Sequence, residues 1–92
     1  MGYIFEWDAR KAASNVKKHG IMFDEATTVF GDPLSLLMTD PKHSEEEQRF
    51  LVMGLSVRHR LLVVAFAERP PYTRIISARL ATRQERNHYE QG

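Results

Sequence analysis

Three segments of strand-type sequence follow one another in the second half of the chain, and the links between them are very short. Residues 49–56, 60–68 and 73–79 are rich in Leu, Val, Ile and Phe and have the lengths of strands. Only residues 57–59 separate the first two segments, and only residues 69–72 separate the last two. Parallel neighbours need a crossover of about a dozen residues or more, so links this short permit only antiparallel hairpins. The sequence therefore predicts an antiparallel β-meander.

The first part of the chain has mostly helical character. A short aromatic segment at residues 3–7 is expected to form an edge strand, and Asp8 after it is a typical helix N-cap. A stripe of small apolar residues at helical spacing then runs to Gly20, which is typical of a helix C-terminus. A second helix is predicted over residues 24–30, and a further strand over residues 34–39.

A capping box marks a third helix at the end of the chain. Thr82 and Glu85 have the spacing at which each side chain accepts the backbone N–H of the other residue, so a helix of about eight residues is predicted. Its one large apolar candidate is Tyr89, so the helix must dock on the sheet or on a partner. We therefore expect one α+β domain over residues 1–92, an antiparallel sheet with two N-terminal helices packed on it and a short C-terminal helix on the same side.

The composition favours a soluble, cytoplasmic protein. The 92 residues include no cysteine, which excludes disulfide frameworks and thiolate metal sites. Residues 1–8 lack the pattern of a secretory signal, and no apolar run approaches the ~20 residues of a membrane span. No membrane partner is therefore expected.

The net charge of +1 hides a division between the two halves of the chain. Residues 1–48 hold five Lys/Arg and nine Asp/Glu, a balance of −4, whereas residues 49–92 hold eight and three, a balance of +5. All eight basic residues of the second half are arginine, whose planar fork suits phosphate. A solvated sheet face with local ion pairs would give the same pattern. The division also fits an anionic ligand together with a separate partner surface.

Two of these arginines are expected at the same end of the sheet. Because the last two strands run in opposite directions, Arg60 at the start of one should lie close to Arg79 at the end of the other. Two guanidinium groups over one phosphate would stabilise the charge that develops during RNA cleavage, in which the substrate's own 2′-hydroxyl is the nucleophile. The alternative is that each arginine pairs with a carboxylate such as Glu6 or Asp8.

Proton transfer needs another group, because arginine has a pKa above about 12 and is a poor base. The candidates are a histidine, a carboxylate or Tyr89. His19 precedes Gly20 and fits a cation at a helix C-terminus better than a catalytic group. The sequence has no His-x-x-x-His or Glu-x-x-His spacing and no Gly-rich phosphate loop, so no metal and no cofactor is expected.

Several short motifs, in order along the chain, resemble the BrnT toxin family. They cover nearly the whole chain, and the match is specific because of their order rather than because of any single one. The motifs are Phe5-Glu6-Trp7-Asp8, Lys18-His19-Gly20, Phe23-x-Glu25-Ala26, Asp32-Pro33, His43-Ser44, Glu47 with Arg49-Phe50, Gly54, Arg60-Leu61-Leu62-Val63-Val64, Arg74-Ile75-Ile76-Ser77-Ala78-Arg79, and Glu85-Arg86 with Tyr89-Glu90.

The resemblance implies a RelE-like fold and a ribonuclease that cleaves RNA without a metal and inhibits translation. It also implies a ribbon-helix-helix antitoxin of the BrnA kind, which neutralises the toxin in a heterotetramer. In that complex only the antitoxin would contact operator DNA. By position, Arg60 and Arg79 match the catalytic arginines of such clefts.

Four further residues are weaker candidates for RNA binding or for support of the reaction. Arg49, His43 and Glu47 belong to motif segments, and Tyr89 parallels a C-terminal base of some relatives. His59 stands where the family would be expected to have glycine, so no role is assigned to it.

The missing general base leaves a second hypothesis open. In it, the chain is a non-catalytic module that binds RNA or serves as a co-repressor together with its antitoxin. Operator binding by this chain alone is disfavoured, because no helix-turn-helix pattern is evident and the basic residues of the second half lie mainly on strands.

Overall fold

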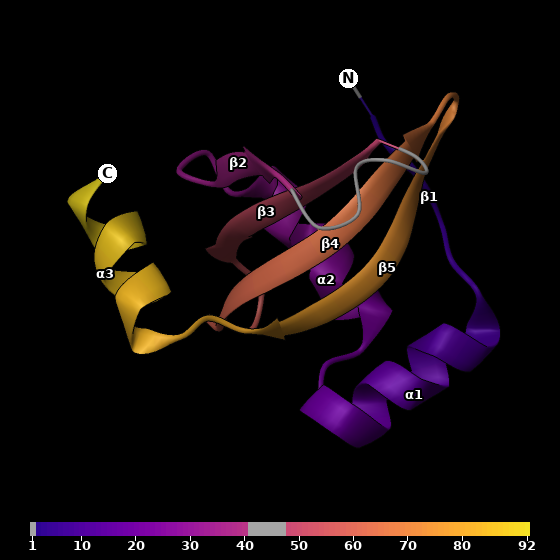
Figure 1. The fold of residues 1–92 in the computed structure, drawn as a ribbon, viewed down its shortest axis with the longest axis horizontal. Helices are drawn as coiled ribbons and strands as arrows, with labels where there is room; N and C mark the ends of the chain where they lie inside the picture. Colours follow the sequence, from indigo (N-terminus) through magenta and orange to yellow (C-terminus); the bar gives the residue numbers. More distant parts are fainter. Residues whose placement is uncertain (1, 41–47) are drawn as a thin grey trace.

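A computed structural model describes residues 2–40 and 48–92 and shows a twisted five-stranded sheet with three α-helices (Figure 1). The strands are β1 (Ile4–Glu6), β2 (Leu36–Thr39), β3 (Arg49–Leu55), β4 (Leu61–Arg69) and β5 (Tyr72–Leu80). The helices are α1 (Ala9–His19), α2 (Phe23–Thr28) and α3 (Arg83–Gln91), and a 3-10 turn at Val29–Gly31 extends α2. None of these helices is long and apolar enough to cross a membrane.

The strand order is β1-β5-β4-β3-β2. Strands β2 to β5 pair antiparallel with their neighbours along the chain, which confirms the predicted meander. Strand β1 is an edge strand, as expected, but it pairs with β5 in the parallel direction, with Ile4 opposite Tyr72 and Glu6 opposite Arg74. The long stretch of chain between β1 and β5 permits this direction, which the short links of the meander do not.

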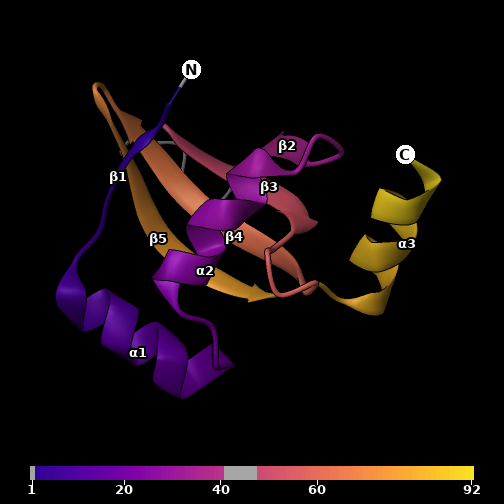
Figure 2. The same ribbon diagram turned by 180° about the vertical axis from the view of Figure 1, so that it is seen from behind.

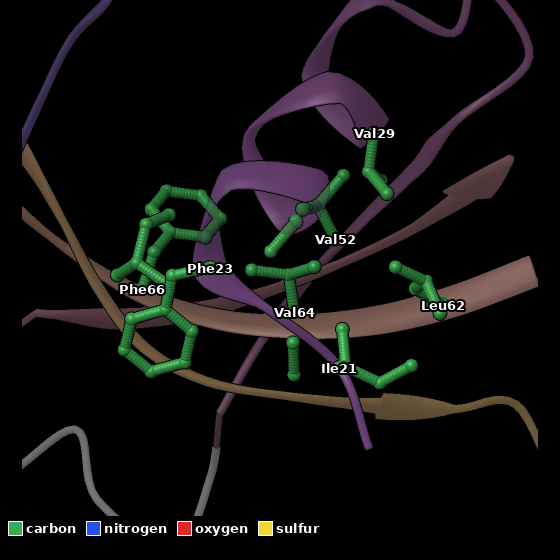
Figure 3. Packing of buried hydrophobic residues seen from close by; sticks show 10 residues of the cluster. Ile21, Phe23, Val29, Val52, Leu62, Val64 and Phe66 are labelled. Carbon is green, nitrogen blue, oxygen red and sulfur yellow. The ribbon is translucent and has the colours of Figure 1, made fainter. Parts of the chain in front are cut away.

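One face of the sheet is covered by α2, while α1 lies beside the outer edge of β5 (Figures 1 and 2). Figure 3 shows Ile21 and Phe23 packed over Val64 at the centre of this face. All three side chains are buried, and each such burial stabilises the fold by about 1.5 to 3 kcal/mol. We call this side of the sheet the α2 face.

A second, smaller cluster lies on the opposite side of the sheet. Neighbouring residues of a strand point to opposite faces, so Val63 lies on the other side from Val64. Val63 packs there with Met53 and Leu61, and Tyr89 of α3 is partly buried against them. Docking of the terminal helix through Tyr89 is thus confirmed, but the expectation that all helices lie on one side is wrong. We call this side the α3 face.

Both ends of α1 form as the sequence predicts. The Asp8 carboxylate accepts hydrogen bonds from the backbone N–H groups of Arg10 (2.7 Å) and Lys11 (3.2 Å), and Gly20 closes the helix with a left-handed φ of 73°.

Helix α1 is joined to β5 by one buried amide. The Asn15 Nδ2 donates to Ala78 O (2.8 Å) and to Ile21 O (2.9 Å), and Asn15 Oδ1 accepts from Ala78 N (3.0 Å). These bonds fix the helix against the stretch of β5 that lies beyond its pairing with β1.

Candidate functional site

Arg79 of β5 lies on the α3 face of the sheet. Its pairing partner on β4 is Val63, and residues directly opposite each other in an antiparallel pair share a face. Arg79 Nη1 donates to Glu85 Oε1 (2.8 Å), and Arg79 Nη2 donates to Glu85 Oε2 (2.9 Å), so the pair is bidentate. The Arg79 side chain is nevertheless 39% exposed, so a ligand can reach it.

Glu85 links Arg79 to the start of α3. One of its carboxylate oxygens also accepts the backbone N–H of Thr82 (2.8 Å), which completes the predicted capping box. The Arg79 guanidinium lowers the pKa of Glu85 to about 2, and the same pair raises the pKa of Arg79. Both groups are therefore charged at neutral pH, and the guanidinium is held in one orientation.

Arg60 lies on the α2 face and holds a different carboxylate. Its Nε donates to Glu25 Oε2 (2.9 Å), and its Nη2 donates to Glu25 Oε1. Glu25 of α2 is buried and also accepts the hydroxyl hydrogen bond of Ser56 (2.6 Å). The hydrogen bond from Arg60 keeps the pKa of Glu25 below its usual value. This group ties α2 to the turn between β3 and β4.

The expectation that Arg60 and Arg79 meet over one anionic group is wrong. The two lie at the same end of the sheet, as predicted, where Leu61 O accepts the backbone N–H of Ala81 (2.9 Å). However, the register places Arg79 opposite Val63, three residues after Arg60, and an odd separation along a strand puts the side chains on opposite faces. Each arginine instead pairs with a carboxylate, as in the alternative considered above.

Tyr89 is held in a hydrogen bond with the loop before β2. Its hydroxyl donates to Asp32 Oδ2 (2.6 Å), and the Asp32 carboxylate also accepts the backbone N–H groups of Leu55 (2.8 Å) and Leu34 (2.9 Å). The bond to Asp32 raises the pKa of Tyr89 to about 12. The phenol is therefore protonated at neutral pH, and in this arrangement it tethers α3.

Gly54 allows the Asp32 carboxylate to approach β3 this closely. A Cβ at this position would lie 3.0 Å from Asp32 Oδ2 and 3.1 Å from side-chain carbons of Ser35 and Val29. The glycine within a strand segment thus marks a close approach of the backbone to another group.

Two more arginines lie on the α3 face, at the other end of the sheet. Arg49 is opposite Ala67, and Ala67 is opposite Arg74, so the three residues form one row across β3, β4 and β5. Ala67 follows Phe66, which belongs to the core of the α2 face, so the row lies on the α3 face. Arg74 pairs with Glu6 of β1 at 3.4 Å. The predicted candidates His43 and Glu47 lie outside the described residues.

The carboxylate partners were the main site residues missed in the sequence. Glu25 lies between Phe23 and Ala26, on a helix whose neighbouring residues are buried, and a buried carboxylate requires a cation or several donors. That signal could have identified Glu25 as a partner of an arginine. Among residues 2–40 and 48–92, no group of three or more His, Asp or Glu is arranged to hold a metal ion.

Comparison with known proteins gives the family. The family model described as the ribonuclease toxin BrnT of type II toxin-antitoxin systems matches residues 7–85. Among solved structures, the chain is similar to the ribonuclease toxin BrnT of Brucella abortus, with a TM-score of 0.65 and 20% identity over 89% of this chain and 100% of that one. This likeness shows that the two proteins share a fold. A comparison with curated proteins finds no match.

The family match takes in α1, α2 and the four strands of the meander, together with Arg60, Arg79 and both of their carboxylate partners. It therefore covers the core of the domain and the residues from which the site is built. The chain belongs to the BrnT family, the ribonuclease toxins of type II toxin-antitoxin systems, and its partner is accordingly an antitoxin.

Proposed function

We propose that the protein is a metal-independent endoribonuclease in which Arg79 binds the scissile phosphate. The observation that carries this proposal is an arginine that is 39% exposed and is held in a fixed orientation by Glu85. A guanidinium fixed before the reaction stabilises charge on the phosphorane oxygens without reorganisation. The 2′-hydroxyl of the RNA supplies the nucleophile.

Arg79 has hydrogen-bond donors left for a phosphate while it stays bound to Glu85. Its five N–H groups include two on Nη1, which donate to Glu85 and to Leu80 O (3.3 Å), and one on Nη2 that donates to Glu85. The Nε–H and the second Nη2–H have no acceptor among the residues that the structure describes. These two donors lie along one edge of the guanidinium and suit bidentate binding of a phosphate.

The other candidate residues receive different roles. Arg49 and Arg74 lie on the same face and would bind flanking phosphates of the RNA. Arg60 serves as a positioning residue, since its pair with buried Glu25 lies on the α2 face. His43 and Glu47 stay weaker candidates for RNA binding or for support of the reaction, and Tyr89 supports α3.

We also propose that the antitoxin silences the toxin by covering the α3 face. A ribbon-helix-helix antitoxin in a heterotetramer would block access of RNA to Arg79 and would bind operator DNA for the pair. RNA cleavage by the released toxin would then inhibit translation in the cytoplasm.

The test is RNA cleavage in the presence of EDTA by the wild type, Arg79→Ala and Arg58→Ala. The wild type should cut RNA and leave a 2′,3′-cyclic phosphate, whereas Arg79→Ala should be slower by about 10²- to 10³-fold, the effect of removing one preorganised donor. Arg58 is an exposed arginine in the turn between β3 and β4, and its variant should retain the wild-type rate. Added antitoxin should suppress cleavage and should still bind Arg79→Ala.

Two results would contradict the proposal. A folded Arg79→Ala protein that cleaves at the wild-type rate would remove the assignment of Arg79. A wild type that shifts RNA in gels but leaves it uncut between pH 5 and pH 9 would instead favour the non-catalytic module.

A further inference from the structure

Helix α1 is strongly basic in an otherwise acidic part of the chain. Within Ala9–His19 it carries Arg10, Lys11, Lys17 and Lys18 and no carboxylate. Cations in the last turn are favoured by the helix dipole, which accounts for Lys17 and Lys18. The same dipole disfavours Arg10 and Lys11 in the first turn. Helix stability therefore does not account for the positive charges of Arg10 and Lys11.

Part of this charge lines a groove between α1 and β5. Lys11, Ser14 and Lys18 follow one flank of the helix at i, i+3 and i+7 and face Ile76 and Ser77 of β5, while Asn15 and His19 complete the lining. The groove has a volume of about 170 Å³ and no carboxylate among its lining residues. Because one water in the liquid takes about 30 Å³, the groove has room for a phosphate group.

The groove follows from how β5 is paired. Strand β1 pairs with β5 only as far as Arg74, and beyond that point α1 lies along the strand in place of a neighbour. The register between β4 and β5 shifts here, because Ala65 pairs with Ser77 whereas Phe66 pairs with Ile75. Ile76 is therefore the extra residue of a β-bulge, and it lies in the groove together with Ser77.

One residue of the groove, Ser77, lies two residues before Arg79 on β5. Ser77 and Arg79 are two residues apart on β5, so both lie on the α3 face. Figure 1 shows α1 beside β5 on the outer side of the sheet, and Lys11 and Lys18 line the groove together with Ser77 of that strand. The carboxylate of Asp8 lies near Lys11 at the far end of the helix and interacts with its charge.

We propose that the groove between α1 and β5 binds a backbone phosphate of RNA that neighbours the phosphate at Arg79. Lys11 and Lys18 supply the charge, and the Ser14 and Ser77 hydroxyls supply hydrogen bonds. Contacts of this kind fix the register of the strand and carry no base specificity. The inference rests on the proposed function, because it extends the RNA path from the cleavage site.

Helix α1 supplies a matched control for the test. Lys11→Gln/Lys18→Gln and Arg10→Gln/Lys17→Gln each remove two positive charges from the same helix, but Arg10 and Lys17 do not line the groove. All four side chains are exposed, and glutamine has a helix propensity close to that of lysine and arginine, so both variants should fold, as thermal melts would check. The probe is a single-stranded RNA with 2′-O-methyl groups throughout, which binds without being cut.

The dissociation constant is measured over a range of salt concentrations. Lys11→Gln/Lys18→Gln should weaken binding about tenfold at low salt. Plotted against the logarithm of the salt concentration, the logarithm of the association constant should fall less steeply, by about 0.7 in slope for each phosphate that the variant no longer neutralises. Arg10→Gln/Lys17→Gln should leave the slope close to that of the wild type. Lys11→Arg/Lys18→Arg, which restores the charge, should bind as the wild type does.

The outcomes separate this inference from the proposed function. If the wild type cleaves RNA and the two double glutamine variants weaken binding equally, the proposal that the groove binds a phosphate is overturned. The assignment of Arg79 to cleavage then stands. If the wild type does not cleave but only the groove pair loses binding, the cleavage assignment falls and the groove stands. A wild type that does not bind the probe at all overturns the groove.

Discussion

At the scale of single residues, Arg60 and Arg79 differ in which edge of the guanidinium they use. Arg60 donates through Nε and Nη2 to Glu25, a buried carboxylate. Arg79 donates through Nη1 and Nη2 to the more exposed Glu85. Removing Arg60 would leave a charge buried without its partner, which destabilises a fold strongly. Substitution at Arg79 breaks a more exposed pair that holds α3, so it should disturb the fold less than substitution at Arg60 and is the better test of the chemistry.

His59 is a second residue whose backbone matters more than its side chain. It has a φ of 63° in the turn between β3 and β4, where its N–H donates to Ser56 O (2.9 Å). A left-handed conformation costs a residue with a Cβ about 1 to 2 kcal/mol, whereas glycine adopts it readily. This geometry explains why the family resemblance leads one to expect glycine here.

Substitution of His59 by glycine should therefore stabilise the protein. The gain is about 0.5 to 1 kcal/mol, because the relief of strain exceeds the extra entropy of glycine in the unfolded chain. Urea unfolding of His59→Gly measures it, with Arg58→Gly as the control, since the neighbouring Arg58 is not at positive φ. A His59→Gly protein no more stable than the wild type would show that the turn is unstrained.

At the scale of the elements, α3 depends on two side-chain tethers. It has no fully buried residue, and its ends are held by the pair of Glu85 with Arg79 and by the hydrogen bond of Tyr89 to Asp32. The sequence marked this helix as marginal on its own, and the structure shows which groups hold it to the sheet.

The substitution Tyr89→Phe should loosen α3 and leave the rest of the fold in place. It removes one hydrogen bond to a charged group, which costs about 1 kcal/mol at a partly exposed site. Hydrogen exchange should therefore become faster for the amides of α3, while those of β4 change little. Tyr72→Phe is the control, because Tyr72 is an exposed tyrosine on β5. Unchanged exchange in α3 would mean that the hydroxyl does not hold the helix.

Local signals explain what could be predicted at this scale. The ends of α1 and the start of α3 follow from Asp8, Gly20 and Thr82, whose hydrogen bonds involve residues close in sequence. The meander follows from the lengths of its links. The parallel pairing of β1 with β5 depends on contacts between distant parts of the chain, and no local pattern specifies it.

The arrangement of the site was harder to predict, because it depends on register. A shift of one residue moves a side chain to the other face of a sheet, and the sequence locates strand ends only to within a residue or two. It was therefore predictable that Arg60 and Arg79 lie at the same end of the sheet. Their separation onto two faces was not, nor was the choice of Glu25 and Glu85 as partners.

At the scale of the whole molecule, four carboxylates with a lowered pKa hold parts of the fold in place. Asp8 caps α1 and is stabilised by the backbone N–H groups of Lys11 and Arg10. Glu25 joins α2 to the β3–β4 turn through Arg60, and Glu85 joins α3 to β5 through Arg79. Asp32 accepts hydrogen bonds from Tyr89 of α3 and from Leu55 of β3, and these bonds lower its pKa against the effect of burial. Protonation of these four carboxylates weakens all of these contacts together.

Stability should therefore fall as the pH is lowered. Because the pKa of Glu85 drops from 4.5 to about 2 on folding, the unfolded chain binds more protons in this range, and the stabilisation is present above about pH 4.5 and lost toward pH 2. Urea unfolding at pH 7, 4 and 2.5 measures the decline. In Glu85→Gln the decline should be shallower. Equal declines in the two proteins would show that Glu85 does not contribute to it.

The amide of Asn15 has a consequence for the protein in solution. A strand edge without a neighbour offers its N–H and C=O groups to strands of other molecules and is a common starting point for aggregation. On the outer side of β5, β1 occupies the first part of this edge, and Asn15 takes up both the N–H and the C=O of Ala78 farther along. Beyond β1, one side chain thus occupies backbone groups of β5 that a strand from another copy of the protein would need.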